Sequence, residues 1–262
     1  MSTPCGLAKP GPACSNGPMI DAKPSTKPVV HAALFDMDGL LFDTERLSLE
    51  LWDTALEQHD YRIAPEILEL TIGRSEQVTK QLLIDTLGSG FPYEQVAACY
   101  AELGRDRIEA DGVPRKPGTT DLLEFLAAAG ILRAVATSSP RATAQYLLEQ
   151  SGLIGHFQSV ITADDVAHSK PDPDIFLKAA QSLGVAPQHC VVFEDSPAGI
   201  RAAHAAGALP ILIPDLVTPD EGIRALCFAE CRNLHKALEL INDRLHLTAP
   251  ASSAVGEHPP RR

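Results

Sequence analysis

Short runs of consecutive apolar residues alternate along the chain with longer segments in which apolar residues recur every three or four positions. Continuous apolar runs are typical of strands buried on both faces, and the longer period is typical of amphipathic helices. The predicted strands span residues 29–35, 131–136, 157–161, 190–193 and 209–213. The predicted helices span residues 119–129, 141–150, 173–183 and 197–206. This alternation predicts an α/β fold in which helices cover both faces of a doubly wound parallel sheet.

The alternation is interrupted between residues 46 and 112, where helical patterns follow one another and no strand is predicted. We therefore expect an all-helical cap domain over 46–112, inserted into a catalytic core formed by 29–45 and 113–247. Ligands of doubly wound sheets bind beyond the carboxyl ends of the strands, and the insert leaves from such an end. A cap in this position is expected to cover the ligand.

Both ends of the chain have a different composition. Residues 1–28 are rich in proline, glycine, alanine and serine, and residues 248–262 have the same character. Such segments bury too little apolar surface to fold, so we expect a disordered leader and a disordered tail.

Composition excludes several classes of partner. The chain of 262 residues carries 22 Lys and Arg against 34 Asp and Glu, a net charge of -12, which argues against binding to nucleic acid. No apolar run approaches the roughly 18 residues that cross a membrane, and no secretory signal precedes residue 28. Six cysteines without a CxxC pair favour a reducing compartment. We expect a cytoplasmic protein, and nothing in the sequence indicates an extensive interface beyond a monomer.

Polar side chains with acidic, basic or hydroxyl groups follow the predicted strands. They are Asp36, Asp38, Thr137, Ser138, Lys170, Glu194 and Asp195. Because the carboxyl ends of parallel strands meet at one edge of a sheet, these groups are expected to converge. Carboxylate oxygens suit Mg²⁺, and two anions that react with one another require positive charge between them. The sequence therefore predicts a site for a divalent cation and a phosphoryl group.

Four segments in this order resemble the motifs of the haloacid dehalogenase superfamily. They are Asp-Met-Asp-Gly-Leu-Leu-Phe-Asp-Thr-Glu at 36–45, Thr-Ser-Ser at 137–139, Lys-Pro-Asp-Pro-Asp-Ile-Phe at 170–176 and Glu-Asp-Ser-Pro-Ala-Gly-Ile at 194–200. The insert after the first segment resembles the helical cap of the β-phosphoglucomutase-like phosphatase branch of that superfamily. The resemblance covers essentially all of residues 29–247.

The resemblance implies a role for each catalytic side chain. Asp36 would be the nucleophile that attacks phosphorus, and Asp38 would be the general acid and base. Thr137 and Lys170 would hold the transferring oxygens, with help from the Ser138 amide.

The resemblance also implies Mg²⁺ as the cofactor. Its ligands would be Asp36, Asp195 and the backbone carbonyl of Asp38, and Glu194 would act directly or through water.

In the cap, Gly73 and Arg74 are candidate substrate contacts. The alternative for this pair is a glycine that ends a helix, followed by a solvated arginine. Arg46 is interpreted as a surface charge, and residues 214–221 as an ordinary surface turn.

The function expected from these residues is a Mg²⁺-dependent phosphatase that hydrolyses a small phosphorylated metabolite, with a sugar phosphate as the expected substrate. A sugar phosphomutase is one alternative, although Ser48 stands where the resemblance to β-phosphoglucomutase would place a histidine. A sensor that binds a phosphometabolite without catalysis is the other, and such a protein is expected to lose a catalytic group.

Overall fold

A parallel sheet forms the centre of the molecule in the computed structural model, which describes residues 27–72, 74 and 76–250. Six strands follow the order β4-β3-β2-β5-β6-β7, and every neighbouring pair is parallel. They are β2 (Ala32–Phe35), β3 (Leu132–Ala136), β4 (Ser159–Ile161), β5 (Cys190–Glu194), β6 (Leu209–Leu212) and β7 (Ala229–Glu230). The predicted doubly wound parallel sheet is thereby confirmed.

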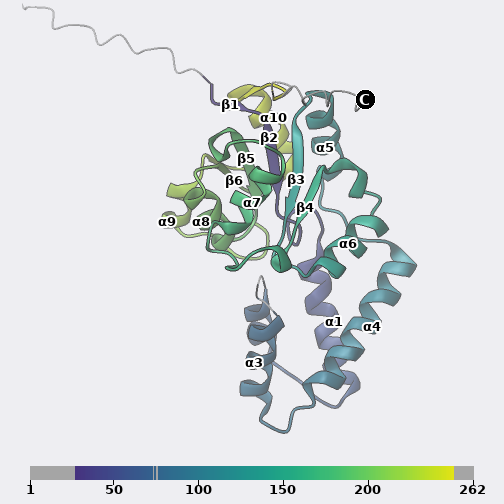
Figure 1. The fold of residues 1–262 in the computed structure, drawn as a ribbon. Helices are drawn as coiled ribbons and strands as arrows, with labels where there is room; N and C mark the ends of the chain where they lie inside the picture. Colours follow the sequence, from purple (N-terminus) through teal and green to yellow (C-terminus); the bar gives the residue numbers. More distant parts are fainter. Residues whose placement is uncertain (1–26, 73, 75, 251–262) are drawn as a thin grey trace, which may run out of the picture.

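Helices cover both faces of this sheet (Figure 1). One face carries α5 (Thr119–Ala128), α6 (Arg141–Gln150) and α10 (Leu234–Arg244). The other carries α7 (Asp174–Ser182) and α8 (Pro197–Ala205), with α9 (Glu221–Leu226) packed beside α8. Short 3₁₀ turns lie at Ile154–His156, Ala163–Asp165 and Pro187–His189.

The central strand β2 contributes to both apolar layers. Its residues Ala33 and Phe35 belong to the cluster under α5 and α10, whereas Ala32 and Leu34 belong to the cluster under α7. All four are completely buried. A strand buried on both faces needs apolar residues at every position, which explains why its sequence is a continuous apolar run.

The insert between β2 and α5 consists of helices that enclose a separate apolar core. Its elements are α1 (Thr44–Gln58), α2 (Pro65–Leu68), the 3₁₀ turn Glu69–Thr71, α3 (Glu76–Leu87) and α4 (Tyr93–Asp111). Trp52 of α1 stacks on Tyr100 of α4 with ring centroids 4.5 Å apart. This helical unit lies beyond the end of the sheet where the predicted site residues are located (Figure 1).

The structure contains elements that the sequence pattern did not predict. Strand β1 (Val29–Val30) separates from β2 at His31 and pairs in parallel with β8 (His246–Leu247). The two-residue strands β7 and β8 are too short to produce a recognisable period. Thr248, which we expected in the tail, donates its backbone N–H to Val30 at 3.1 Å.

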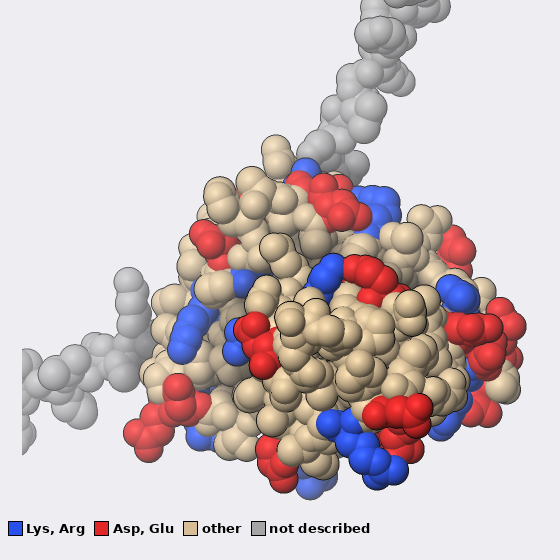
Figure 2. Space-filling model, turned by 90° about the horizontal axis from the view of Figure 1, so that it is seen from below, with Lys and Arg blue, Asp and Glu red and all other residues tan. Residues whose placement is uncertain are grey.

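The proposed leader and tail otherwise lie largely outside the described residues. None of the helices in the described part of the chain is long and apolar enough to cross a membrane. The four cysteines of the described ranges are free thiols. Acidic and basic side chains are interspersed on the face that carries the cap (Figure 2).

Candidate active site

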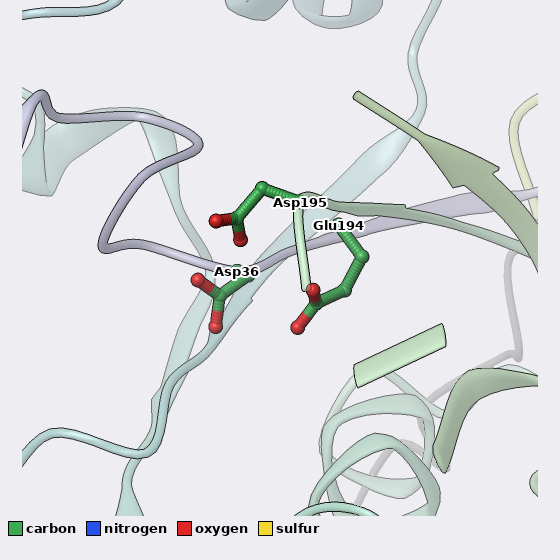
Figure 3. A group of neighbouring side chains, drawn as sticks. All are labelled: Asp36, Glu194 and Asp195. Atoms are coloured by element: carbon green, nitrogen blue, oxygen red, sulfur yellow. The ribbon is translucent and has the colours of Figure 1, made fainter. Parts of the chain in front are cut away.

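Three carboxylates meet at the carboxyl ends of β2 and β5. Asp36 follows β2, Glu194 ends β5 and Asp195 follows it, and one oxygen of each lies within 4.8 Å of the others. The two strands are neighbours, and the Asp36 N–H donates to the Phe193 carbonyl at 3.0 Å. The carboxylates therefore gather at one point of the sheet edge (Figure 3).

Lys170 brings positive charge to this group. Its ammonium donates to Asp36 and, at 2.6 Å, to Oε1 of Glu194, and its side chain is only 5% exposed. Burial alone would lower the pKa of Lys170, but the charges of Asp36 and Glu194 outweigh burial and raise the pKa. The lysine therefore stays protonated and acts as a fixed cation.

The carboxylates remain undercompensated by this one lysine. The pKa of Asp36 is raised to about 8: burial is the largest cause, the charges of Glu194 and Asp38 act in the same direction, and Lys170 opposes them. Burial also raises the pKa of Asp195 well above its ordinary value, and the neighbouring Glu194 and Asp36 act in the same direction. When all three carboxylates are ionised, they and the one ammonium carry two excess negative charges, which fits the binding of a hard divalent cation.

Asp38 lies in the tight loop after Asp36, and its carboxylate is held by hydroxyl groups. Thr44 donates to Oδ1 at 2.6 Å, and Ser139 donates to Oδ2 at 2.7 Å. Thr137 is a longer donor to the same Oδ2, at 3.4 Å. These hydroxyl groups orient a carboxyl group beside Asp36 without neutralising it.

Two glycines permit the close approach of the loops that carry the carboxylates. Gly39 has a φ of 80°, and a Cβ on it would lie 2.4 Å from Oδ2 of Asp195. Gly199 in the first turn of α8 lies against Glu194, and a Cβ there would be 1.7 Å from Oε1. A side chain at either position would displace an acidic group of the site.

The structure brings together most of the residues predicted for the core of the site. Lys170 lies within this carboxylate group, and the buried Thr137 hydroxyl reaches Asp38. Asp38 is not one of the three clustered carboxylates, since its carboxylate accepts from Thr44, and its predicted metal contact was through the backbone carbonyl. Ser138 has an exposed side chain, and the proposed contact there concerned its amide.

Of the two cap candidates, Gly73 and Arg74, the structure describes Arg74. Gly73 lies outside the described residues, and Arg74 is exposed on the segment before α3. The Arg74 backbone N–H donates to Thr71 at 3.0 Å.

Three polar residues of the surroundings have contacts that the sequence analysis did not predict. Ser139 and Thr44 contact Asp38, although both belong to segments that the motifs already single out. Asp215 was interpreted as part of a surface turn, and that interpretation is wrong because its side chain is only 3% exposed. It pairs with Lys116 and with Arg46, so Arg46 is more than the solvated surface charge we expected. No local pattern in the sequence marks Asp215, since its partners are distant along the chain.

Comparison with known proteins agrees with this geometry. A family model described as haloacid dehalogenase-like hydrolase matches residues 30–207. The chain is 32% identical to the phosphorylated carbohydrates phosphatase of Thermotoga maritima, over 68% of this chain and 82% of the relative. It is 34% identical to the fructose-1-phosphate phosphatase YqaB of Escherichia coli, over 66% of this chain and 91% of the relative.

A solved structure shows the same fold. CbbY from Rhodobacter sphaeroides, crystallised in complex with phosphate, superposes with a TM-score of 0.68 and 26% identity, over 81% of this chain and 96% of CbbY.

The chain belongs to the haloacid dehalogenase-like hydrolases. Within that family it is a phosphatase of the β-phosphoglucomutase-like branch, and the resemblance seen in the sequence is confirmed.

Proposed function

We propose that the chain is a Mg²⁺-dependent phosphatase that hydrolyses a sugar phosphate through an aspartyl-phosphate intermediate. The observation that carries this proposal is the buried contact of Lys170 with both Asp36 and Glu194, next to Asp195. This contact supports the proposal because the reaction needs a nucleophilic carboxylate, a fixed cation and oxygen ligands for a divalent cation close together, and these side chains have those chemical groups.

Two carboxyl groups of the first loop divide the chemistry between them. A carboxylate oxygen of Asp36 attacks phosphorus while the bond from phosphorus to the sugar oxygen breaks, and Asp38 gives its proton to that oxygen. In the second half, Asp38 takes a proton from water as the water oxygen attacks the aspartyl phosphate. The products are free phosphate and regenerated Asp36. Thr44 and Ser139 hold the Asp38 carboxylate by hydrogen bonds of 2.6 and 2.7 Å, which orients it for both transfers.

The remaining predicted residues bind the phosphoryl group. Lys170 and Thr137 supply donors that stay fixed during the reaction, with the amide of Ser138 as a third. Fixed donors in a site with little water stabilise developing charge more strongly than water does.

Mg²⁺ fits the donor set of this site. Asp36 and Asp195 would hold it, with the backbone carbonyl of Asp38 and with Glu194 in support, because these oxygens are hard and carry excess negative charge. When bound, the cation neutralises the charge between two anions that must approach one another.

A sugar phosphate is the substrate class that the relatives favour. The names of the similar proteins refer to phosphorylated carbohydrates and to fructose 1-phosphate. The cap lies over the site and offers polar groups such as the Ser48 and Tyr100 hydroxyls, whose oxygens are 3.0 Å apart. Burial raises the pKa of Tyr100, so this phenol remains a neutral hydrogen-bonding group.

The experiment that tests the proposal measures phosphate release from a panel of sugar phosphates, nucleotides and glycerol phosphate, with and without Mg²⁺. We expect Mg²⁺-dependent release by the wild type and none by Asp36→Asn. The exposed Asp53 on α1 provides a matched control, because Asp53→Asn changes the same chemical group outside the site. Full activity of Asp36→Asn would contradict the assignment of the nucleophile.

The mutase alternative is tested on the same samples with an assay of glucose 1-phosphate isomerisation to glucose 6-phosphate. Isomerisation without net release of phosphate would replace hydrolysis by mutase activity. Tight binding without either activity would favour a sensor. A monomeric state and a cytoplasmic location stay predictions from the sequence, and size-exclusion chromatography with light scattering tests the first of them.

A further inference from the structure

The chain crosses between the core and the cap twice, and the two crossings lie side by side. The N–H of Asp43 donates to the Pro114 carbonyl at 2.8 Å, and the N–H of Lys116 donates to the Leu41 carbonyl at 2.9 Å. A single antiparallel bridge joins the residues between these two pairs. These paired segments, 41–43 and 114–116, are called the hinge below.

A group of four charges lies at this hinge. Asp215 accepts from Lys116 at 2.7 Å and from Nη1 of Arg46 at 2.8 Å, both through Oδ1. Asp43 contacts the same two cations, at 2.5 Å from Arg46 and 3.4 Å from Lys116. Two carboxylates therefore share two cations, and each cation contacts both acids.

The four residues come from different parts of the structure. Arg46 lies in the first turn of α1 and therefore belongs to the cap, whereas Lys116 lies in the returning hinge segment. Asp215 comes from the loop after β6 in the core, and its side chain is only 3% exposed. The pair between Arg46 and Asp215 thus spans the hinge, and the pair between Lys116 and Asp215 fixes the returning segment to the core.

The other oxygen of Asp215 faces the loop that follows β2 and carries Asp36 and Asp38, which is called the catalytic loop below. Oδ2 is buried and has no hydrogen-bond partner among the described residues. A Cβ on Gly39 would lie 3.5 Å from this oxygen and 2.4 Å from Oδ2 of Asp195. Gly39 is therefore close both to the charge cluster of the hinge and to the carboxylates of the site.

We propose that Asp215 is a positioning residue that couples the cap hinge to the catalytic loop. Its carboxylate holds Arg46 and Lys116, and so fixes the first turn of α1 relative to the loop that carries Asp36 and Asp38. Thr44, the first residue of α1, holds the Asp38 carboxylate directly. A change in the angle of α1 therefore changes the position of the group that protonates the leaving oxygen.

Three variants of Arg46 and Asp215, with one control, test this coupling. Both ion pairs of Arg46 are made through Nη1, so Arg46→Lys keeps a point charge within reach and is expected to retain most of the coupling. Arg46→Gln removes the charge that spans the hinge while Lys116 still pairs with Asp215. Asp215→Asn weakens both pairs at once. Arg62→Gln is the matched control, because Arg62 is an 86% exposed cap arginine paired with Glu57.

The first measurement is hydrogen–deuterium exchange at the hinge, read at the amides of Asp43 and Lys116. Exchange at these amides is expected to rise about three- to tenfold in Arg46→Gln and Asp215→Asn, because a charge-assisted contact that spans the hinge is lost. Arg46→Lys and Arg62→Gln are expected to exchange like the wild type. This measurement does not depend on the proposed phosphatase activity.

The second measurement compares a sugar phosphate with p-nitrophenyl phosphate, whose phenolate leaves without strong help from an acid. We expect kcat/KM, which reports on the steps up to departure of the alcohol, to fall about three- to tenfold on the sugar phosphate in Arg46→Gln and to stay near the wild-type value on the aryl ester. The parameter kcat also contains hydrolysis of the aspartyl phosphate, which is common to both substrates and also uses Asp38. Arg46→Lys is expected to restore most of the loss.

Two results would overturn the coupling. One is hinge exchange in Arg46→Gln equal to that of Arg62→Gln, and the other is an equal loss of kcat/KM on both substrates. If Asp215→Asn does not fold, the partly exposed Arg46 still decides the question. Inactivity of the wild type on both esters would instead count against the proposed function, and the exchange result would stand by itself.

Discussion

Gly199 offers a direct test of how the carboxylate of Glu194 is held. Gly199 lies in the first turn of α8, and a Cβ there would be 1.7 Å from Oε1 and 1.9 Å from Cδ of Glu194. Ordinary van der Waals contact between a methyl carbon and a carboxylate atom begins at about 3.5 Å. The substitution Gly199→Ala therefore requires the carboxylate to move by more than about 1.5 Å.

The expected magnitude follows from the bonds that this movement breaks. Oε2 of Glu194 accepts from the Ser196 amide at 2.7 Å and from its hydroxyl at 2.9 Å, and Oε1 accepts from Lys170 at 2.6 Å. Hydrogen bonds to a charged group contribute about 1.5–3 kcal/mol each, so the loss of two costs roughly 3–6 kcal/mol. Alanine stabilises a helix by only about 1 kcal/mol relative to glycine. The displacement of Glu194 therefore outweighs the gain in helix propensity.

The assay is thermal unfolding together with titration of Mg²⁺ by calorimetry. A net loss of about 3 kcal/mol in the free energy of unfolding lowers Tm by roughly 6–12 °C for a domain of this size. We also expect weaker binding of Mg²⁺, because Glu194 is displaced from beside Asp36 and Asp195. The control is Gly155→Ala, since a Cβ at Gly155 meets nothing within 4 Å.

A Gly199→Ala protein with a Tm at or above that of the wild type, and with unchanged Mg²⁺ affinity, would refute this reasoning. It would mean that helix propensity dominates and that Glu194 is not held where the structure has it. A loss of the same size in Gly155→Ala would show that the effect does not arise from contact with Glu194.

Further predictions concern the cap and the buried thiols. Arg74→Ala is expected to change KM or the ranking of sugar phosphates more than the dependence on Mg²⁺, and a profile equal to that of the exposed control Arg105→Ala would leave Arg74 a solvated charge. Leu83 is completely buried in the cap, so Leu83→Ala is expected to cost about 2–5 kcal/mol in chemical denaturation, and a cost below about 1 kcal/mol would contradict this packing. Burial raises the pKa of Cys190 to about 12, so iodoacetamide at pH 8 should modify Cys99 well before Cys190 in the native protein, as peptide mass spectrometry can show. Because the folded pKa exceeds the unfolded one, stability from the protonated Cys190 thiol is full below pH 9 and declines as the pH rises toward 12.

The parts of the fold that could be predicted are those with a strong local signal. Strands β2 and β5 are buried on both faces, so their apolar runs mark them without ambiguity. The strand pair β1 and β8 carries no such signal, because each has only two residues and their pairing depends on segments from opposite ends of the sequence. A strand buried on both faces leaves a continuous apolar run in the sequence. A contact between two short edge strands leaves no local pattern and exists only in the assembled fold.

The same distinction applies to the site. Asp36 and Asp195 follow strands that the pattern identifies, so their convergence could be expected from a parallel sheet. The burial of Asp215 could not, because Pro-Asp in a short connection is typical of a surface turn. Its environment arises only when the hinge and the loop after β6 come together. The requirement for glycine at position 199 could not be predicted either, because the sequence does not show that the Glu194 side chain lies against it.

The pairing of β1 with β8 has a practical consequence. It places Val29 beside His246, at the end of the sheet remote from the cap (Figure 1). A short linker from the end of β8 back to the start of β1 could therefore close a circular permutant, with new termini opened in a surface loop elsewhere. For the same reason, a reporter domain fused near either strand, or attachment to a solid support there, would leave the entrance to the site accessible.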